Sequence, residues 1–465
     1  MTFEKRGIPT AVHASHSFEK LLRMEAKASG MPDLGVWVTP HPVAGKSGEA
    51  LRQEADKAID DIIRALTRPR EKKGKEVAKE SNTITFEGTD FFETFERFNR
   101  HCLQERWGDG LPLVPLTREK VAWMLTGTDR SLKDKVVMAR PSGRIVTVEA
   151  VAINAVMAGA LPAYMPVIIT ALEAWDECPF GWGSVTTTSP AAPLVVVKGP
   201  IAKQLDINSK SNAAGYGWRG NTTIGRTIEL IFKTVGGAIP GITDMSIAGD
   251  ARTITSTVVA ENEDVLNDIG WPSYAETLGL PKDANILTIG PAFWGFEEIW
   301  IKADSPEELL RCLIWEVSTK VREGIMGWGG GLFLLMSPEH AKMLAQGGWT
   351  KEKVTKYLAT ALPKRWCFPK GQLREVYKAA YPRAPQELKE LPDDILITGY
   401  SADPKDYLIF VVGGAGNESQ SWRVWRWTSP YDPGFVTREI KLPKNWDKIV
   451  EQSEIQTMPM PKLPW

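Results

Sequence analysis

The chain has 465 residues, 43% hydrophobic and 24% charged, which is typical of a globular protein large enough for two or three domains. A formal net charge of −1 offers no basic face, so we expect neither nucleic acid nor a membrane as a partner. The four cysteines lack CxxC pairing and no signal peptide is apparent, which together favour a cytoplasmic location.

The first 66 residues alternate between short apolar runs and helical patterns. The predicted elements are, in chain order, a strand (10–13), a helix (18–28), a strand (35–39) and a helix (49–66). Such alternation indicates an α/β fold, here a truncated, flavodoxin-like doubly wound half-domain over residues 1–66. It is too small to bury both faces of a sheet by itself. The charge-rich residues 67–82 are predicted to be an exposed linker.

The rest of the chain is predicted to form a larger α/β or α+β body. We expect a main α+β domain over 83–280 and a C-terminal α/β region with a Trp-rich tail over 281–465. The predicted helices cover 90–105, 117–125, 148–160, 222–235 and 306–319. The predicted strands cover 194–197, 285–289, 331–336, 395–398 and 407–412. The aromatic stripe of the first of these helices is predicted to be core: Phe91, Phe92, Phe95 and Phe98.

Three of the five histidines follow the two N-terminal strands: His13, His16 and His41. Loops after parallel strands converge on one edge of a sheet, so the three imidazoles are predicted to share a site. They could bind a transition metal ion, with zinc, copper or iron as the candidates, and His13 could also act in catalysis. Alternatively, His16 caps its helix and the other two fill loop space.

One carboxylate is a candidate catalytic group on its local sequence. Asp109, in Arg106-Trp-Gly-Asp-Gly-Leu-Pro112, lies between two glycines, which predicts an exposed carboxylate in a functional loop. A tight Gly-Asp-Gly turn explains the same residues equally well.

A Gly-rich loop over 215–220 leads into the helix predicted over 222–235. Free N–H groups at a helix N-terminus bind anions, so we expect Asn221 and Arg226 to bind an anionic substrate. Helix capping alone, by Asn221 or Thr222, is the alternative. The loop is neither a Walker A loop nor a GxGxxG after a strand, so no nucleotide cofactor is expected.

A hydroxyl-rich run covers 183–190, and its Thr187 is a candidate oxyanion-binding residue. A threonine-rich edge strand would explain this run equally well. Cys178, just upstream, has no cationic neighbour in the sequence. We therefore expect a small buried hydrophobic side chain there rather than a reactive thiol.

Several of these motifs resemble a bacterial family. Glu4-Lys-Arg-Gly-Ile-Pro-Thr10 and the Pro-His-Pro at 40–42 are similar to the C-terminal part of small proteins named for a (seleno)cysteine-Gly-Ser-Cys motif. Residues 106–264, which include Gly-Asn-Thr-Thr-Ile-Gly-Arg, resemble a large uncharacterised companion domain, and Ser337-Pro-Glu-His-Ala341 fits the same pattern. By motif position, the resemblance implies site roles for Glu149 and Asn154.

The Cys-Gly-Ser-Cys motif itself does not occur in the sequence. The thiol redox chemistry that the resemblance implies therefore cannot be assigned to any cysteine of this chain. Either a partner subunit carries the motif and completes the half-domain, or the redox role is absent.

Taken together, the sequence favours a subunit of a metal-assisted or thiol-linked redox enzyme that acts on a small anionic organic substrate. Asp109, Glu149 or His13 would move protons in such an enzyme. A metal-dependent lyase or hydrolase without net redox is one alternative. A non-catalytic subunit that docks a catalytic partner is another. In each case a homo- or hetero-oligomer is expected.

Overall fold

The N-terminal unit is a small parallel α/β layer. The computed structural model describes residues 2–6, 8–43, 46–67, 83–189, 191–317, 331–376, 378, 381–383, 386–424 and 434–456. The elements of the unit are α1 (Thr2–Lys5), β1 (Ala11–Ser15), α2 (Glu19–Ala28), β2 (Gly35–Thr39) and α3 (Gly48–Thr67). β1 and β2 pair in parallel, from Ala11 opposite Gly35 to Ser15 opposite Thr39. The predicted strand–helix alternation is therefore confirmed for this unit.

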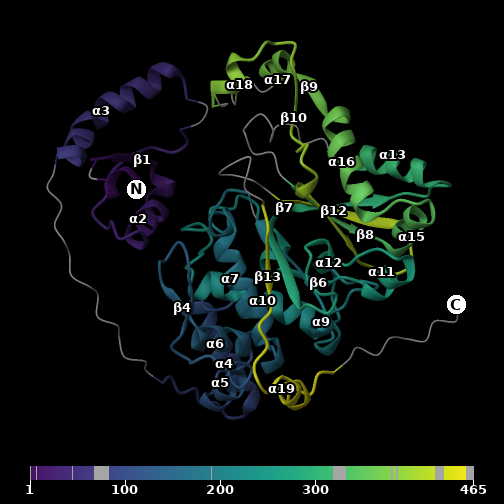
Figure 1. The fold of residues 1–465 in the computed structure, drawn as a ribbon. Helices are drawn as coiled ribbons and strands as arrows, with labels where there is room; N and C mark the ends of the chain where they lie inside the picture. The colour runs from purple at the N-terminus through teal and green to yellow at the C-terminus, as the bar shows by residue number, and fades with distance from the viewer. Residues whose placement is uncertain are drawn as a thin grey trace.

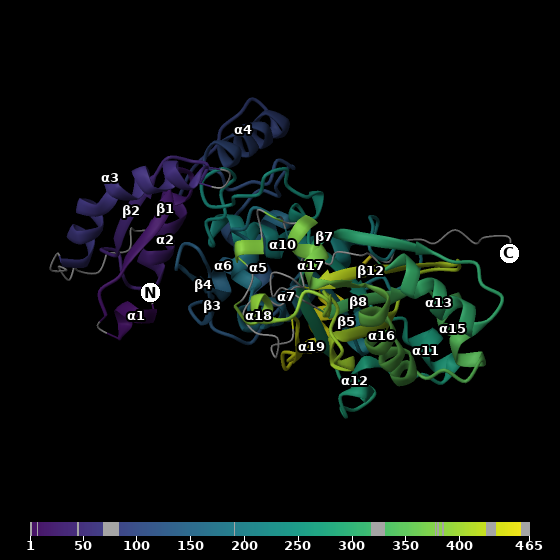
Figure 2. The same cartoon turned by 90° about the horizontal axis from the view of Figure 1, so that it is seen from above.

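The N-terminal unit lies beside the body (Figures 1 and 2). One close contact packs the unit itself, and a second joins it to the body. Gly35 lets α3 approach β2, since a Cβ at Gly35 would lie 2.7 Å from the Cβ of Ala65. On the other side of the unit, α2 meets the body, where Arg140 pairs with Glu25 at 3.0 Å. The predicted linker, 68–82, lies outside the described residues.

A seven-stranded sheet forms the centre of the body. Its strands are β5 (Ala191–Lys198), β6 (Thr257–Ala260), β7 (Ile286–Trp300), β8 (Gly331–Met336), β11 (Tyr407–Val411), β12 (Glu418–Val424) and β13 (Val436–Glu439). The strand order is β11-β8-β12-β7-β5-β6, and β13 pairs with β7. Strands from the predicted regions 83–280 and 281–465 thus hydrogen-bond in one sheet, so the two regions share a core.

Helices cover this sheet and supply the apolar cores. The helices before β7 are α4 (Phe91–Gln104), α5 (Arg118–Leu125), α6 (Val148–Ala158), α7 (Met165–Glu177), α8 (Gly181–Ser184), α9 (Pro200–Gln204), α10 (Arg219–Thr234), α11 (Glu263–Ile269) and α12 (Tyr274–Thr277). Those after it are α13 (Pro306–Glu316), α15 (Pro338–Gln346), α16 (Lys351–Arg365), α17 (Lys370–Val376), α18 (Gln386–Glu390) and α19 (Trp446–Gln452). Two small sheets complete the fold: β3 (Lys135–Met138) with β4 (Ile145–Thr147), and β9 (Cys367–Pro369) with β10 (Leu396–Thr398).

The largest core lies where α6, α7 and α10 meet β5 and β7, and it includes Trp175 and Phe232. Alternate residues of β5 point to opposite faces, so Val195 joins this core while Leu194 joins a second one. Burial on both faces explains why β5 reads as a continuous apolar run in the sequence. The mixed α/β class predicted from the sequence is therefore confirmed.

Two local predictions are wrong. The aromatic stripe of α4 is only partly core, because Phe91 and Phe92 are 68% and 74% exposed while Phe98 is buried. The first turn of α4 lies beyond the core, so its two phenylalanines remain in solvent. Helix α10 begins at Arg219 with Trp218 as its N-cap, so neither Asn221 nor Thr222 caps it.

Residues 434–456, which we call the C-terminal strap, run across the body from β13 to α19 (Figure 1). The amide of Ile440 donates to the carbonyl of Asn285, and the amide of Lys444 donates to the Asp129 carboxylate. The far end is fixed by the Trp446 indole, which donates to Gln204. Among the described residues, no helix combines the length and apolarity needed to cross a bilayer.

Candidate functional site

The carboxyl ends of β1 and β2 bring histidine and hydroxyl side chains together. In the parallel register His13 faces Trp37 and Ser15 faces Thr39. Side chains alternate along a strand, so these four residues share one face of the two-stranded sheet. The His13 and Trp37 rings lie in contact, with centroids 4.3 Å apart.

Hydrogen bonds link these side chains across the two strands. The His13 Nε2 atom lies 2.8 Å from Thr39 Oγ1, and Ser15 Oγ lies 3.0 Å from His41 Nδ1. The main-chain N–H of His41 donates to His16 Nδ1 at 3.0 Å. Both hydroxyl residues are buried, whereas the three histidines are exposed. The buried hydroxyls thus hold the His13 and His41 rings, and the His41 N–H holds the His16 ring.

The backbone contact sets the protonation of His16. Since Nδ1 accepts a hydrogen bond from an N–H group, the neutral ring carries its proton on Nε2. A nitrogen that carries a proton does not ligate a metal, so His16 is a hydrogen-bond donor on its outer edge. His13 and His41 are the histidines left for the predicted zinc, copper or iron site. Among the described residues, no group of three or more His, Cys, Asp and Glu side chains is arranged to hold a metal ion.

This protonation state is testable by NMR. We expect long-range ¹H–¹⁵N spectra of the full chain at alkaline pH to give His16 as the Nε2–H tautomer. His101, whose ring lies among Phe86 and Trp107, is an internal reference outside this unit. An Nδ1–H tautomer at His16 would contradict the hydrogen bond from His41.

Asp109 and Arg226, predicted separately as catalytic and substrate-binding, form one buried ion pair. The guanidinium donates from Nε to Oδ2 at 2.7 Å and from Nη2 to Oδ1 at 2.9 Å, and Nη2 also contacts the carbonyls of Leu111 and Pro112. The two side chains are only 11% (Arg226) and 1% (Asp109) exposed, so the predicted exposure of the Asp109 carboxylate is wrong. The guanidinium holds the loop after α4 against α10.

The electrostatics of this pair favour the charged form of Asp109. Burial alone would raise the pKa of its carboxyl. The hydrogen bonds and positive charge of Arg226, together with the Leu111 amide, outweigh burial and lower the pKa below its ordinary value. A carboxylate held in this way is a poor general base.

The side-chain amides of Asn221 and Asn154, both predicted to bind substrate, form hydrogen bonds with other groups of the protein. Asn221 accepts from the Asn208 amide at 2.8 Å and donates to three main-chain carbonyls, among them that of Val258 at 2.8 Å. Asn154 donates to the Ala150 carbonyl and accepts from the Thr234 hydroxyl, both at 2.8 Å. Both residues are buried, so they position the segments around α10.

The remaining predicted site residues lie in the body. Thr187 Oγ1 accepts from the Ser189 amide in a turn, so the predicted alternative of a threonine strand is wrong there. Glu149 lies in the first turn of α6 and is exposed. Neither residue belongs to the N-terminal unit that holds the histidines, and their site roles stay predictions.

Two thiols of the body have low reactivity because they are buried. Burial raises the pKa of Cys178 to about 12 and that of Cys102 to about 11. Cys178 is buried beneath β7, with its Sγ 3.6 Å from the Ile289 carbonyl. A thiol with so high a pKa stays protonated at neutral pH and is a weak nucleophile. Cys178 therefore has the buried side chain that its sequence context predicts.

Sequence reasoning missed Ser15 and Thr39. The available signal was the two-residue alternation along β1 and β2, which places each hydroxyl two positions beyond His13 or Trp37 on the same face.

One comparison with known proteins matches the N-terminal unit. Residues 1–68 match the model of the UGSC family. This is the family named for the (seleno)cysteine-Gly-Ser-Cys motif, and the match covers the whole β1–α2–β2–α3 unit. No curated protein and no solved structure matches the chain. The resemblance of residues 106–264 to a companion domain stays a prediction.

Proposed function

We propose that this chain is a subunit of a thiol-linked redox enzyme acting on a small organic molecule, with its reaction site at the carboxyl ends of β1 and β2. The observation that carries the proposal is the hydrogen-bonded set Ser15, His41 and His16, with exposed imidazole edges. An imidazole ring that is exposed and held in one orientation by hydrogen bonds is suited to proton transfer near neutral pH.

The open sheet edge supports a partner. In the described part of the chain, β1 pairs with β2 alone. Parallel sheets are nearly always larger than two strands, and an unpaired strand edge offers a row of N–H and C=O groups. A strand that adds beside β1 in parallel would end at the same edge as His13 and His41. We infer that a partner subunit supplies such a strand.

The thiol is assigned to the partner. None of the four cysteines of this chain lies in residues 1–68, and burial keeps Cys102 and Cys178 protonated. The likeness of residues 1–68 to a family named for a Cys-Gly-Ser-Cys motif supports a partner with that motif. A nearby imidazole takes the thiol proton, and the resulting imidazolium lowers the thiol pKa.

The test measures thiol reactivity in a mixed complex. The full chain is mixed with a protein that carries the Cys-Gly-Ser-Cys motif, and alkylation by iodoacetamide is followed against pH. We expect complex formation to lower the apparent thiol pKa below about 7.5, from about 8.5 for a free thiol. In Ser15→Ala and His41→Gln the pKa should return toward the free value, because the oriented imidazole is lost.

Ser17→Ala is the matched control, because it removes a hydroxyl two residues away that takes no part in the set. An unchanged thiol pKa in the wild-type complex would rule the proposal out. The same conclusion would follow if Ser15→Ala and Ser17→Ala behaved alike.

A further inference from the structure

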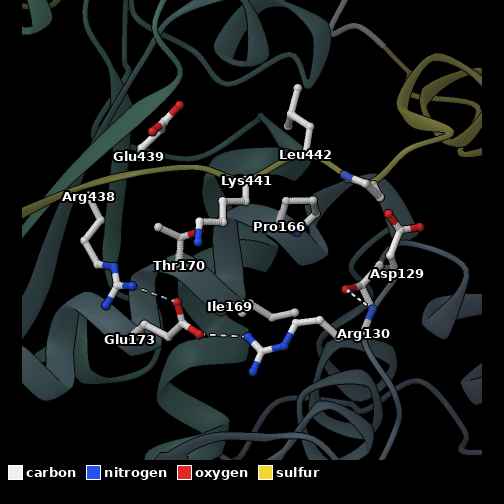
Figure 3. Close-up of a pocket in the computed structure, with 12 residues that line it drawn as sticks. Asp129, Arg130, Pro166, Ile169, Thr170, Glu173, Arg438, Glu439, Lys441 and Leu442 are labelled. Carbon is white, nitrogen blue, oxygen red and sulfur yellow. Dashed lines mark hydrogen bonds and ion pairs between the residues drawn. The ribbon is translucent and has the colours of Figure 1, made fainter. Parts of the chain in front are cut away.

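A cavity of about 430 Å³ lies between α7 and the C-terminal strap (Figure 3). Its volume is in the range of pockets that bind small molecules. The lining residues all belong to the body: Thr128, Asp129, Arg130, Pro166, Ile169, Thr170, Glu173, Arg438, Glu439, Lys441, Leu442 and Pro443. The cavity is therefore distinct from the site at the ends of β1 and β2.

Three cationic side chains line the cavity. Arg130 and Arg438 share the Glu173 carboxylate, at 2.8 Å and 3.4 Å, and this holds both guanidiniums in place. The Lys441 ammonium has no ion-pair or hydrogen-bond partner among the described residues. It extends toward Thr170 on α7 (Figure 3). A cation without a partner beside a largely buried hydroxyl residue is suited to bind an oxyanion.

The charges define the ligand. Glu173 and Glu177 form ion pairs with the two guanidiniums. Asp129 accepts from the Lys444 amide, and Glu439 points away from Glu173 and Lys441 (Figure 3). Lys441 is therefore the wall cation that no carboxylate of the described residues contacts, which favours a singly charged anion.

The apolar part of the wall completes the assignment. Pro166 and Ile169 of α7 lie beside the cationic groups, and Pro443 of the strap also lines the cavity. These surfaces offer contact to a short hydrocarbon. We propose that the cavity binds a small organic monocarboxylate, with the carboxylate on Lys441 beside the Thr170 hydroxyl and the apolar part on Pro166 and Ile169.

The strap forms one wall, so ligand binding should also hold the strap on the body. The wall residues 441–443 lie between two attachments, the Ile440 amide on Asn285 and the Lys444 amide on Asp129. A ligand that contacts Lys441 and α7 together would slow the opening of this segment. Hydrogen exchange of residues 438–446 therefore gives a second readout that does not depend on the heat of binding.

The experiment is calorimetric titration of the full chain with butyrate and benzoate, with butyramide as an uncharged analogue. We expect saturable binding of the carboxylates, no binding of butyramide, and slower exchange in residues 438–446 when a carboxylate is present. Lys441→Met should weaken carboxylate binding by about 10-fold or more, because it removes a charge-assisted hydrogen bond. Lys444→Met is the matched control: its side chain is exposed and lies outside the cavity wall, so affinity should not change.

Three results would overturn the assignment. Equal carboxylate affinities for wild type and Lys441→Met would place the binding elsewhere. Saturable binding of inorganic phosphate without binding of butyrate or benzoate would replace the organic monocarboxylate by an inorganic anion. Absence of any saturable binding would remove the site.

Discussion

Replacing Arg226 with alanine is expected to lower the free energy of unfolding by about 3–5 kcal/mol, because it leaves a buried carboxylate without its partner. The Asp109 side chain is 1% exposed and receives two hydrogen bonds from the guanidinium. The sequence alone predicts the opposite pattern, a loss of substrate affinity with little loss of stability. Urea unfolding of the full chain, followed by tryptophan fluorescence, measures the difference.

The pH dependence of the unfolding free energy tests whether the loss in Arg226→Ala comes from the ion pair. The folded-state pKa of the Asp109 carboxyl lies below the ordinary value for an aspartate, so its contribution to stability is complete above that ordinary value and is lost as pH falls through the folded pKa. The difference between wild type and Arg226→Ala should therefore shrink on acidification. Arg219→Ala, which removes an exposed side chain at the first residue of the same helix, is the control. A fully stable Arg226→Ala variant would contradict the assignment of Arg226 as structural.

Replacing Lys351 with methionine is expected to lower the free energy of unfolding by a similar amount, about 3–5 kcal/mol. Its ammonium lies 2.9 Å from Glu261 Oε1, and the two side chains are 5% and 0% exposed. The second carboxylate oxygen of Glu261 accepts from the Tyr274 amide, so the pair joins the start of α16 to the segment between β6 and α12. Thermal and urea unfolding measure the loss.

Lys353→Met provides the comparison for Lys351. This residue lies on the same helix and is exposed, and its ammonium donates to the Gly348 carbonyl. Its replacement should change stability by less than about 1 kcal/mol. Adding Glu261→Gln to Lys351→Met should recover part of the loss, since the buried charge is then removed. Equal stability of the two lysine variants would show that the buried pair contributes nothing.

Local sequence patterns predicted the helices and strands that contacts between nearby residues determine. Strand β8 has the predicted bounds Gly331–Met336, and α13 starts at Pro306, as predicted. In the structure Ser305 caps α13 and Ser337 caps α15. Each hydroxyl accepts from the amide three residues later, a contact that short sequence patterns specify. The N-terminal unit was predictable for a similar reason, since its strands and helices alternate within 60 residues or so.

Contacts between distant residues were not predictable in this way. Asp109 and Arg226 lie 117 positions apart, so each was interpreted as a separate site residue. Strand β7 was predicted to end at Ile289, because the Gly290-Pro291 that follows usually ends a strand. In the sheet, Pro291 lies opposite Pro193 of β5, and β7 continues to Trp300. Only the pairing of two distant strands determines that outcome.

The contact between His41 and His16 restricts the length of the loop after β2. Proline has no main-chain N–H, so His41 is the one residue of Pro40-His41-Pro42 that can donate from the backbone. An insertion of one residue between Thr39 and Pro40, or deletion of Pro40, would place a proline opposite His16 and leave its Nδ1 without this donor. Changes of length are therefore expected to be tolerated beyond Pro42, in the approach to α3, and not between Thr39 and His41.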